Sequence, residues 1–70
     1  MESERERIGK RIAEIRKEKG LTQRELAELA EVGYGHLARI ETGKYSTGID
    51  LLCKIANALG YRLDFIDNKY

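Results

Sequence analysis

Residues 21–44 read LTQRELAELAEVGYGHLARIETGK, and the rest of the chain is organised around this stretch. Thr22 and Glu25 have capping-box spacing, in which the threonine hydroxyl accepts from the N–H of Glu25 and the glutamate accepts from the N–H of Thr22. Leu21 and Leu26 flank the box at the spacing of a hydrophobic staple. A helix is therefore predicted to begin just after Thr22.

This first helix is short, because Glu31-Val32-Gly33 interrupts its apolar stripe. A second helical pattern follows Gly33 and is closed by Gly43, which suits the left-handed position after a helix end. Leu37 and Ile40 lie on one side of this second helix. The opposite arc carries Gly35, Ala38, Arg39 and Thr42, with Tyr34 at its margin. Two helices joined by so tight a turn indicate a helix-turn-helix, with one face packed and the other turned outward.

At these residues the chain resembles the phage repressor and Cro type of helix-turn-helix protein, also called the XRE family. The matching elements are Thr22-Gln23-x-Glu25-Leu26-Ala27, Val32 and Leu37-x-Arg39-Ile40-Glu41-x-Gly43-Lys44. The likeness runs from about Ile8 to Leu59. It implies an all-α, lambda repressor-like bundle of four to five helices, in which the first helix of the pair crosses the DNA backbone and the second enters the major groove.

The resemblance also implies the roles of individual residues. The helix start around Thr22 and Gln23 offers free N–H groups to a phosphate, and Gln23 matches the family residue that holds the DNA backbone. Gly43 and Lys44, with Tyr45 following, match the family's second clamp. Arg16 matches an arginine that pairs with the glutamate of the reading helix, here Glu41. The full expected DNA-binding set is Thr22, Gln23, Gly33, Tyr34, Gly35, His36, Ala38, Arg39, Thr42, Lys44 and Tyr45.

Within this set, Arg39 is the best candidate for a bidentate guanine contact. Gly35 and Ala38 offer a smooth surface to a thymine methyl group and cannot donate side-chain hydrogen bonds. For His36, an ordinary surface role and a DNA contact stay open, and Tyr34 is assigned to DNA in preference to packing.

Two positions depart from the family pattern. Glu31 stands where the turn usually has glycine, and Gly33 stands where the reading helix usually has a serine or threonine cap. A non-glycine residue in a left-handed conformation costs about 1 kcal/mol, so the turn and the cap are each expected to be weakened.

Length and composition exclude several classes of protein. Seventy residues form one domain (1–70, with a core of 4–60), and the net charge of +1 means that the distribution of charge, and not its total, must favour DNA. No nucleophile–base pair, phosphate loop or metal-spaced cluster exists, so the chain is predicted to be neither an enzyme nor a metal or cofactor protein. Cys53 has no second cysteine to pair with and is interpreted as a packing residue. No apolar run is long enough for a membrane span, so a soluble, cytoplasmic protein is predicted.

Two further helices are predicted around the central pair. Ser3 and Glu6 have capping-box spacing and open a helix over residues 4–19. Thr47 and Asp50 have the same spacing, and an apolar helical pattern follows them until Gly60.

The segment after Gly60 has a different pattern. Tyr61, Leu63 and Phe65 alternate with Arg62 and Asp64, which predicts a β-strand over residues 61–67. A lone strand needs a partner for its backbone groups, and the simplest partner is the same strand of a second copy. The predicted dimerisation residues are Tyr61, Leu63, Phe65 and Ile66. The antitoxin branch of the family pairs its C-terminal strands in this way, although a short fifth helix is the family's other form.

Two functions remain open on this basis. The first is a homodimeric, sequence-specific transcriptional regulator of double-stranded DNA, a repressor or autoregulator that binds an inverted-repeat operator. It could be the antitoxin of a toxin–antitoxin operon or a small phage or restriction-system regulator. The second is a protein-interaction module that binds and neutralises a cognate protein such as a toxin.

Overall fold

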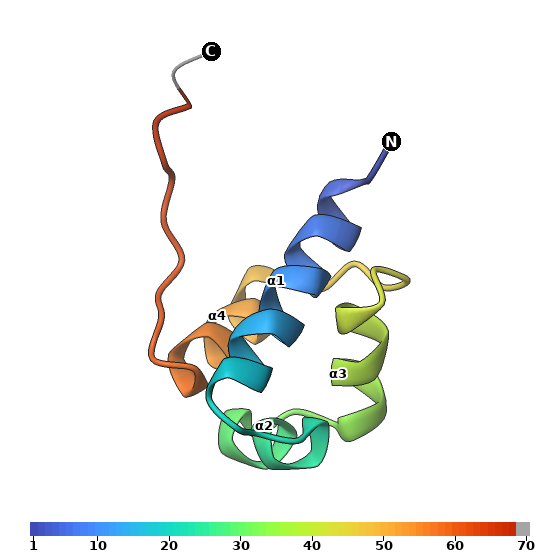
Figure 1. The fold of residues 1–70 in the computed structure, drawn as a ribbon, viewed down its shortest axis with the longest axis vertical. Helices are drawn as coiled ribbons and strands as arrows, with labels where there is room; N and C mark the ends of the chain where they lie inside the picture. Colours follow the sequence, from blue (N-terminus) through green and yellow to red (C-terminus); the bar gives the residue numbers. More distant parts are fainter. Residues whose placement is uncertain (69–70) are drawn as a thin grey trace.

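Residues 1–68 of this computed structural model are described, and they form four helices (Figure 1). In chain order these are α1 (Glu4–Glu18), α2 (Gln23–Ala30), α3 (Tyr34–Glu41) and α4 (Ile49–Ala58). In Figure 1, α1 descends through the molecule to α2 at the base, α3 forms one flank, and α4 lies on the other side of α1. The predicted all-α bundle is confirmed, with four helices.

The starts of α1 and α2 are fixed by the two capping boxes that the sequence predicts. Ser3 Oγ accepts from the N–H of Glu6 at 3.2 Å, and the Ser3 N–H donates to Glu6 Oε1 at 2.9 Å. In α2, Thr22 Oγ1 accepts from the N–H of Glu25 at 3.1 Å, and the Thr22 N–H donates to Glu25 Oε1 at 2.8 Å. Each box satisfies two backbone donors that the helix itself leaves unpaired, which is why these helices begin where they do.

The predicted cap of α4 is wrong. The helix starts one residue later than a Thr47 cap would place it, with Gly48 as the N-cap and no side-chain hydrogen bond to the first turn. Gly48 is extended, with φ −76° and ψ 165°, which is typical of an N-cap residue. Capping-box spacing alone was insufficient here, because the apolar face of α4 must also turn toward the core and so determines where the helix begins.

The core lies among the four helices, where α2 packs against α3 and α4 and α1 packs against α3. Leu26, Leu37 and Ile55, one from each of α2, α3 and α4, are completely buried. The other buried apolar residues are Ile12, Ile15, Ala27, Ala30, Ile40 and Leu59. At about 25 cal/mol per Å² of apolar surface removed from water, this burial is the main stabilising term of so small a fold.

α1 and α3 pack unusually closely at Gly9. A β-carbon built on Gly9 would lie 2.3 Å from the carbonyl oxygen of Ile40 and 2.8 Å from that of Glu41. Gly43 has φ +77°, and a β-carbon there would lie 2.7 Å from the backbone of Glu6. Glycine at these two positions therefore lets the C-terminal end of α3 lie directly on α1.

The turn between α2 and α3 depends on Glu31. This residue has φ +58° and ψ +44°, and it is the only non-glycine residue with positive φ in the part of the chain that the structure describes. The predicted strain at the position where the family has glycine is therefore confirmed.

The predicted β-strand over residues 61–67 is wrong, since no strand occurs within residues 1–68. The chain leaves α4 through Gly60, at φ +82°, and runs as an extended segment along one side of the molecule (Figure 1). Alternating apolar residues specify which side chains share a face, but a strand forms only where a neighbouring strand pairs with its backbone. No such neighbouring strand lies beside it within residues 1–68. No helix in residues 1–68 is long and apolar enough to cross a membrane.

Candidate nucleic-acid interface

α3 divides cleanly into a packed face and an open face. Leu37, Ile40 and Glu41 are buried. The open face carries Tyr34, Gly35, Arg39 and Thr42, which are exposed, with Ala38 half-buried beside them. Within residues 1–68 this face stays open apart from Tyr34, whose ring is contacted by Arg24, and α3 forms the flank of the molecule in Figure 1. The face is shallow because two of its residues have almost no side chain.

The ion pairs in the structure leave this face positive. On α1, Arg7 pairs with Glu4, Arg11 pairs with Glu14, and Lys10 pairs with Glu2. The hydrogen bonds from Arg7 hold the pKa of the Glu4 carboxyl below its ordinary value. By contrast, Arg24, Arg39 and Lys44 in the helix-turn-helix have no ion-pair partner among residues 1–68. A net charge near zero is thus compatible with a local surface that attracts phosphate.

A buried polar network joins the three helices behind this face. Arg16 Nε donates to Glu41 Oε2 at 2.7 Å, and Arg16 Nη2 donates to Glu41 Oε1 at 3.0 Å. Arg16 Nη1 also donates to the carbonyl oxygen of Leu21 at 2.9 Å. Only 9% of Arg16 and 8% of Glu41 are exposed. The bidentate pair anticipated between α1 and α3 is therefore present, and it also holds the loop that precedes α2.

Gln23 is the third member of this network, which sequence reasoning did not foresee. Its Nε2 donates to Glu41 Oε1 at 2.9 Å, so the side chain expected on the DNA backbone is directed toward α3. The second N–H of the same amide group remains to donate elsewhere. The backbone N–H groups of Gln23 and Arg24 also have no acceptor within residues 1–68, whereas the capping box uses those of Thr22 and Glu25. The start of α2 thus retains donors suited to an anion.

Arg24 and Tyr34 form a contact that connects α2 with α3. The central guanidinium carbon of Arg24 lies 4.2 Å from the centroid of the Tyr34 ring, the geometry of a cation–π interaction. Arg24 occupies the variable position of the motif Thr22-Gln23-x-Glu25, so the sequence did not identify it as a functional residue. A signal was nevertheless present, since arginine in the first turn of a helix opposes the helix dipole.

His36, Thr42 and Tyr45 are less available to a ligand than the sequence suggested. The rings of His36 and Tyr45 meet edge to face, with centroids 4.5 Å apart at 84°. His36 Nε2 is buried and makes no hydrogen bond within residues 1–68, and the Thr42 hydroxyl donates to the carbonyl oxygen of Arg39 at 2.9 Å. The structure therefore gives His36 a packing contact with the loop that follows α3.

The loop after α3 is fixed by backbone hydrogen bonds. The N–H of Gly43 donates to the carbonyl oxygen of Ile40 at 3.1 Å, and that of Lys44 donates to the carbonyl oxygen of Arg39 at 3.1 Å. With Gly43 left-handed, this is a helix-ending arrangement that holds Lys44 beside the end of α3. Gly33, at the other end of α3, gives no side-chain cap.

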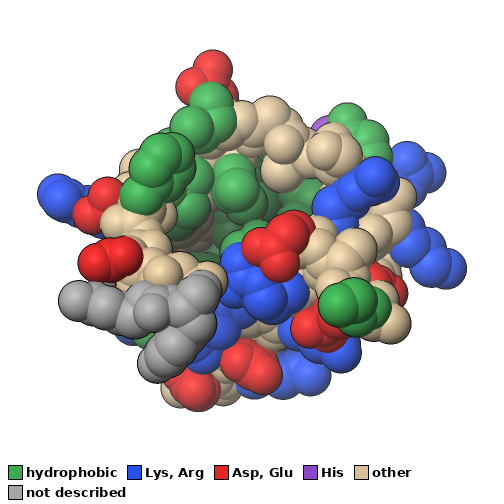
Figure 2. Space-filling model, turned by 90° about the horizontal axis from the view of Figure 1, so that it is seen from above, with side chains coloured by type: hydrophobic (Ala, Val, Ile, Leu, Met, Phe, Trp, Pro, Cys, Tyr) green, Lys and Arg blue, Asp and Glu red, His purple; other side chains and the backbone are tan. Residues whose placement is uncertain are grey.

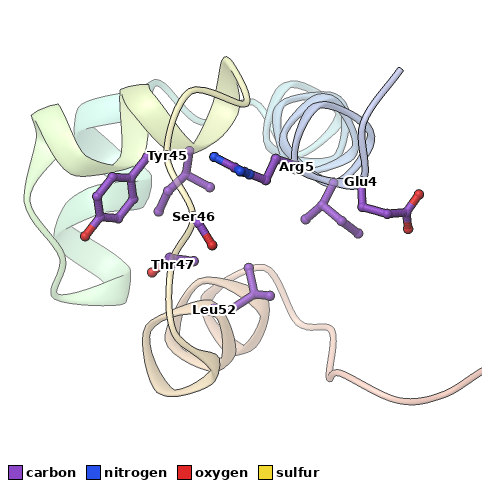
Figure 3. Close-up of a pocket in the computed structure, with 8 residues that line it drawn as sticks. Glu4, Arg5, Tyr45, Ser46, Thr47 and Leu52 are labelled. Carbon is purple, nitrogen blue, oxygen red and sulfur yellow. The ribbon is translucent and has the colours of Figure 1, made fainter. Parts of the chain in front are cut away.

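A second surface feature is an apolar hollow between α1, α4 and the loop after α3. It has a volume of about 180 Å³, with Ile8, Ile40 and Leu52 among its lining residues. Hydrophobic side chains form its floor in Figure 2, and in Figure 3 Leu52 points into it while the Glu4 carboxylate points away.

Among residues 1–68, no group of histidine, cysteine, aspartate or glutamate side chains could hold a metal ion.

A tight pair of helices with a stable polar network behind it, and an open, locally cationic outer face, define a helix-turn-helix domain of the nucleic-acid-binding class. Comparison with known proteins makes the assignment definite. The chain belongs to the HTH_3 helix-turn-helix family, whose model matches residues 12–66. This is a family of transcriptional regulators and not of enzymes, as the resemblance read from the sequence implied.

Two curated relatives illustrate the family. The chain is 42% identical over 59 residues to the immunity repressor protein of Bacillus phage phi105, an alignment that covers 84% of this chain and 41% of that protein. It is 40% identical over 55 residues to the HTH-type transcriptional regulator PuuR of Escherichia coli, covering 79% of this chain and 30% of that protein. The chain therefore spans less than half the length of these two relatives.

Solved structures show the same fold. The clp gene regulator ClgR from Corynebacterium glutamicum superposes with a TM-score of 0.80 at 37% identity, covering 84% of this chain and 76% of that one. The restriction-modification controller protein C.AhdI from Aeromonas hydrophila superposes with a TM-score of 0.81 at 29% identity, covering 83% and 88%.

Proposed function

We propose that this chain is a sequence-specific regulator of transcription that represses by binding double-stranded DNA as a homodimer. The observation that carries the proposal is the open face of α3, with Arg39 and Lys44 unpaired within residues 1–68 and the small residues Gly35 and Ala38 between polar ones. A face of this shape lets the backbone of α3 approach the floor of a major groove closely. The immunity repressor relative supports repression as the mode of regulation.

Each residue of the face takes a role suited to its chemistry. Arg39 reads guanine through two hydrogen bonds, worth about 1–3 kcal/mol of discrimination. Gly35 and Ala38 lie against a thymine methyl group. Phosphates are held at one end by the α2 start, Thr22 and Gln23, and at the other by Lys44 and Tyr45. The rest of the proposed DNA-contacting surface is formed by Gly33, Tyr34, His36 and Thr42.

A homodimer supplies the length of operator that one copy cannot read. Two α3 helices related by a two-fold axis and about 34 Å apart would enter successive major grooves of an inverted repeat. The apolar side chains of Tyr61, Leu63, Phe65 and Ile66 are proposed as the dimer contact. Phe65 is fully exposed and Ile66 is 89% exposed in the single chain, which supports a partner for them.

The dimer contact is tested by ending the chain after Gly60. Sedimentation at micromolar concentration is expected to show the intact chain as a dimer and the shortened chain as a monomer. Circular dichroism checks that the shortened chain retains its helices. If the shortened chain is helical and still dimeric, the segment after Gly60 (the tail) does not form the dimer interface.

The exposed tail also supports the second candidate, a module that binds a cognate protein such as a toxin. In that case the tail would meet a different chain, and DNA binding would be weak or indifferent to sequence. The antitoxin role combines both functions, with the open face of α3 on DNA and the tail on the toxin.

DNA selection separates these candidates. The wild-type protein is used to enrich duplexes from a library with a randomised centre, and the enriched duplex is compared with a scrambled duplex of the same composition by gel shift. We expect an enriched inverted repeat. Arg39→Ala should lose about tenfold or more of the discrimination. Lys54→Ala should lose none, since this lysine lies on α4 and has no ion-pair partner within residues 1–68. Failure to enrich any sequence would favour the protein-interaction module.

A further inference from the structure

Arg24 breaks a local rule of helix stability. It lies in the first turn of α2, where the partial positive charge of the helix end makes a cation unfavourable by about 0.3–1 kcal/mol. Glu28, four residues further on, is the acid best placed to offset this charge, but the two form no ion pair. Local rules are commonly broken where a residue serves a function.

The guanidinium of Arg24 stacks on the aromatic ring of Tyr34 and donates no hydrogen bond within residues 1–68. Its central carbon lies 4.2 Å from the centroid of Tyr34, and within residues 1–68 its N–H groups have no hydrogen-bond acceptor. Arg7, Arg11 and Arg16 by contrast all donate to carboxylates. Stacking restricts the side chain while leaving the N–H groups along the edge of the guanidinium free.

We propose that Arg24 is a further DNA contact, that its edge N–H groups bind a backbone phosphate, and that Tyr34 is the positioning residue that holds it there. A pre-oriented guanidinium loses less rotamer entropy on binding than a free arginine side chain does. The phosphate assignment follows from its position, because the start of α2 also presents the unpaired backbone N–H groups of Gln23 and Arg24. The inference rests on the proposed function and adds to it a residue and a role.

The roles of the two residues predict an unequal pattern of effects. The ring of Tyr34 is what holds Arg24, so losing the ring should weaken binding more than losing the hydroxyl alone. A phosphate contact carries no sequence information, so losing Arg24 should weaken specific and scrambled duplexes equally. Each phosphate contact contributes about 0.9 to the slope of log affinity against log salt concentration.

The experiment measures affinity across salt concentrations for the wild-type protein on the selected and scrambled duplexes. The variants are Arg24→Ala, Tyr34→Phe, Tyr34→Leu and the double variant Arg24→Ala/Tyr34→Leu, with Lys54→Ala as the matched charge deletion outside the helix-turn-helix. Thermal unfolding of each variant confirms that it is folded at the assay temperature.

We expect Arg24→Ala to lose about tenfold in affinity on both duplexes and about 0.9 in salt slope. Tyr34→Phe keeps the ring and should lose less affinity than Tyr34→Leu, which should lose about threefold. Tyr34→Leu should cost little further once Arg24 is alanine. Lys54→Ala should change neither quantity.

Three outcomes would overturn the inference. These are an Arg24→Ala variant with unchanged salt slope, a Tyr34→Phe variant as weak as Tyr34→Leu, or additive losses in the double variant. In each of these cases the wild-type protein still binds DNA, and the proposed function stands. Absence of wild-type binding to either duplex is instead the failure of the proposed function itself.

Discussion

Replacing Glu41 by alanine is expected to lower the free energy of unfolding by about 3 kcal/mol. The change removes both acceptors of a bidentate pair whose distances are 2.7 and 3.0 Å. Arg16, only 9% exposed in the wild type, then keeps only the Leu21 carbonyl as acceptor. Losing one partner of a buried pair costs about 3–5 kcal/mol. The lower end applies here because Arg16 retains that one hydrogen bond.

The measurement is urea unfolding followed by helical circular dichroism, with thermal unfolding as a second readout. For a chain of this size, 3 kcal/mol corresponds to a fall of roughly 12–24 °C in Tm. Total stability is only about 4–10 kcal/mol, so the scan starts at low temperature. Glu14→Ala is the matched control. It breaks an exposed ion pair to Arg11 and should change stability by less than about 1 kcal/mol.

A double variant tests the cause of the loss. In Arg16→Met/Glu41→Leu no buried charge remains without a partner, so stability should return to within about 1 kcal/mol of the wild type, because apolar replacement of a buried pair is often neutral or stabilising. The reasoning is refuted if Glu41→Ala unfolds at the same urea concentration as the wild type, or if the double variant is no more stable than Glu41→Ala.

Three further substitutions test the fold and the open face of α3. Gly9→Ala should lower the free energy of unfolding by about 1–3 kcal/mol, because its β-carbon would meet backbone oxygens of α3 at 2.3 and 2.8 Å. If the variant unfolds at the same urea concentration as the wild type, α1 and α3 can move apart at little cost. Gly35→Ala has no atom within 4 Å of its β-carbon, so it should stabilise by about 0.5–1 kcal/mol. The same variant should bind the selected duplex more weakly, and unchanged affinity would place Gly35 outside the DNA contact. Glu31→Gly should raise stability by about 1 kcal/mol by relieving the left-handed conformation at φ +58°, and a lower Tm would mean that the glutamate side chain compensates for the strain.

The sequence by itself determined the features that depend on neighbours three or four residues apart. The capping boxes at Ser3 and Thr22 and the two faces of α3 follow from local hydrogen bonds and helical periodicity. The left-handed turn at Glu31 was implied by the resemblance to a family that usually has glycine at this position. Local spacing was not sufficient at Thr47. Thr47 and Asp50 have capping-box spacing, but α4 begins at Ile49 with Gly48 as its N-cap, because the packing of α4 determines where it starts.

Only the tertiary structure decided contacts between side chains that are distant in the sequence. Gln23 donating to Glu41, Arg24 stacking on Tyr34 and His36 meeting Tyr45 have no periodic signature, since each depends on how two helices or a helix and a loop are oriented. The segment after Gly60 shows the same principle for the backbone. Its alternating residues are compatible with a strand, but backbone N–H and C=O groups form a strand only where another strand is present to pair with them.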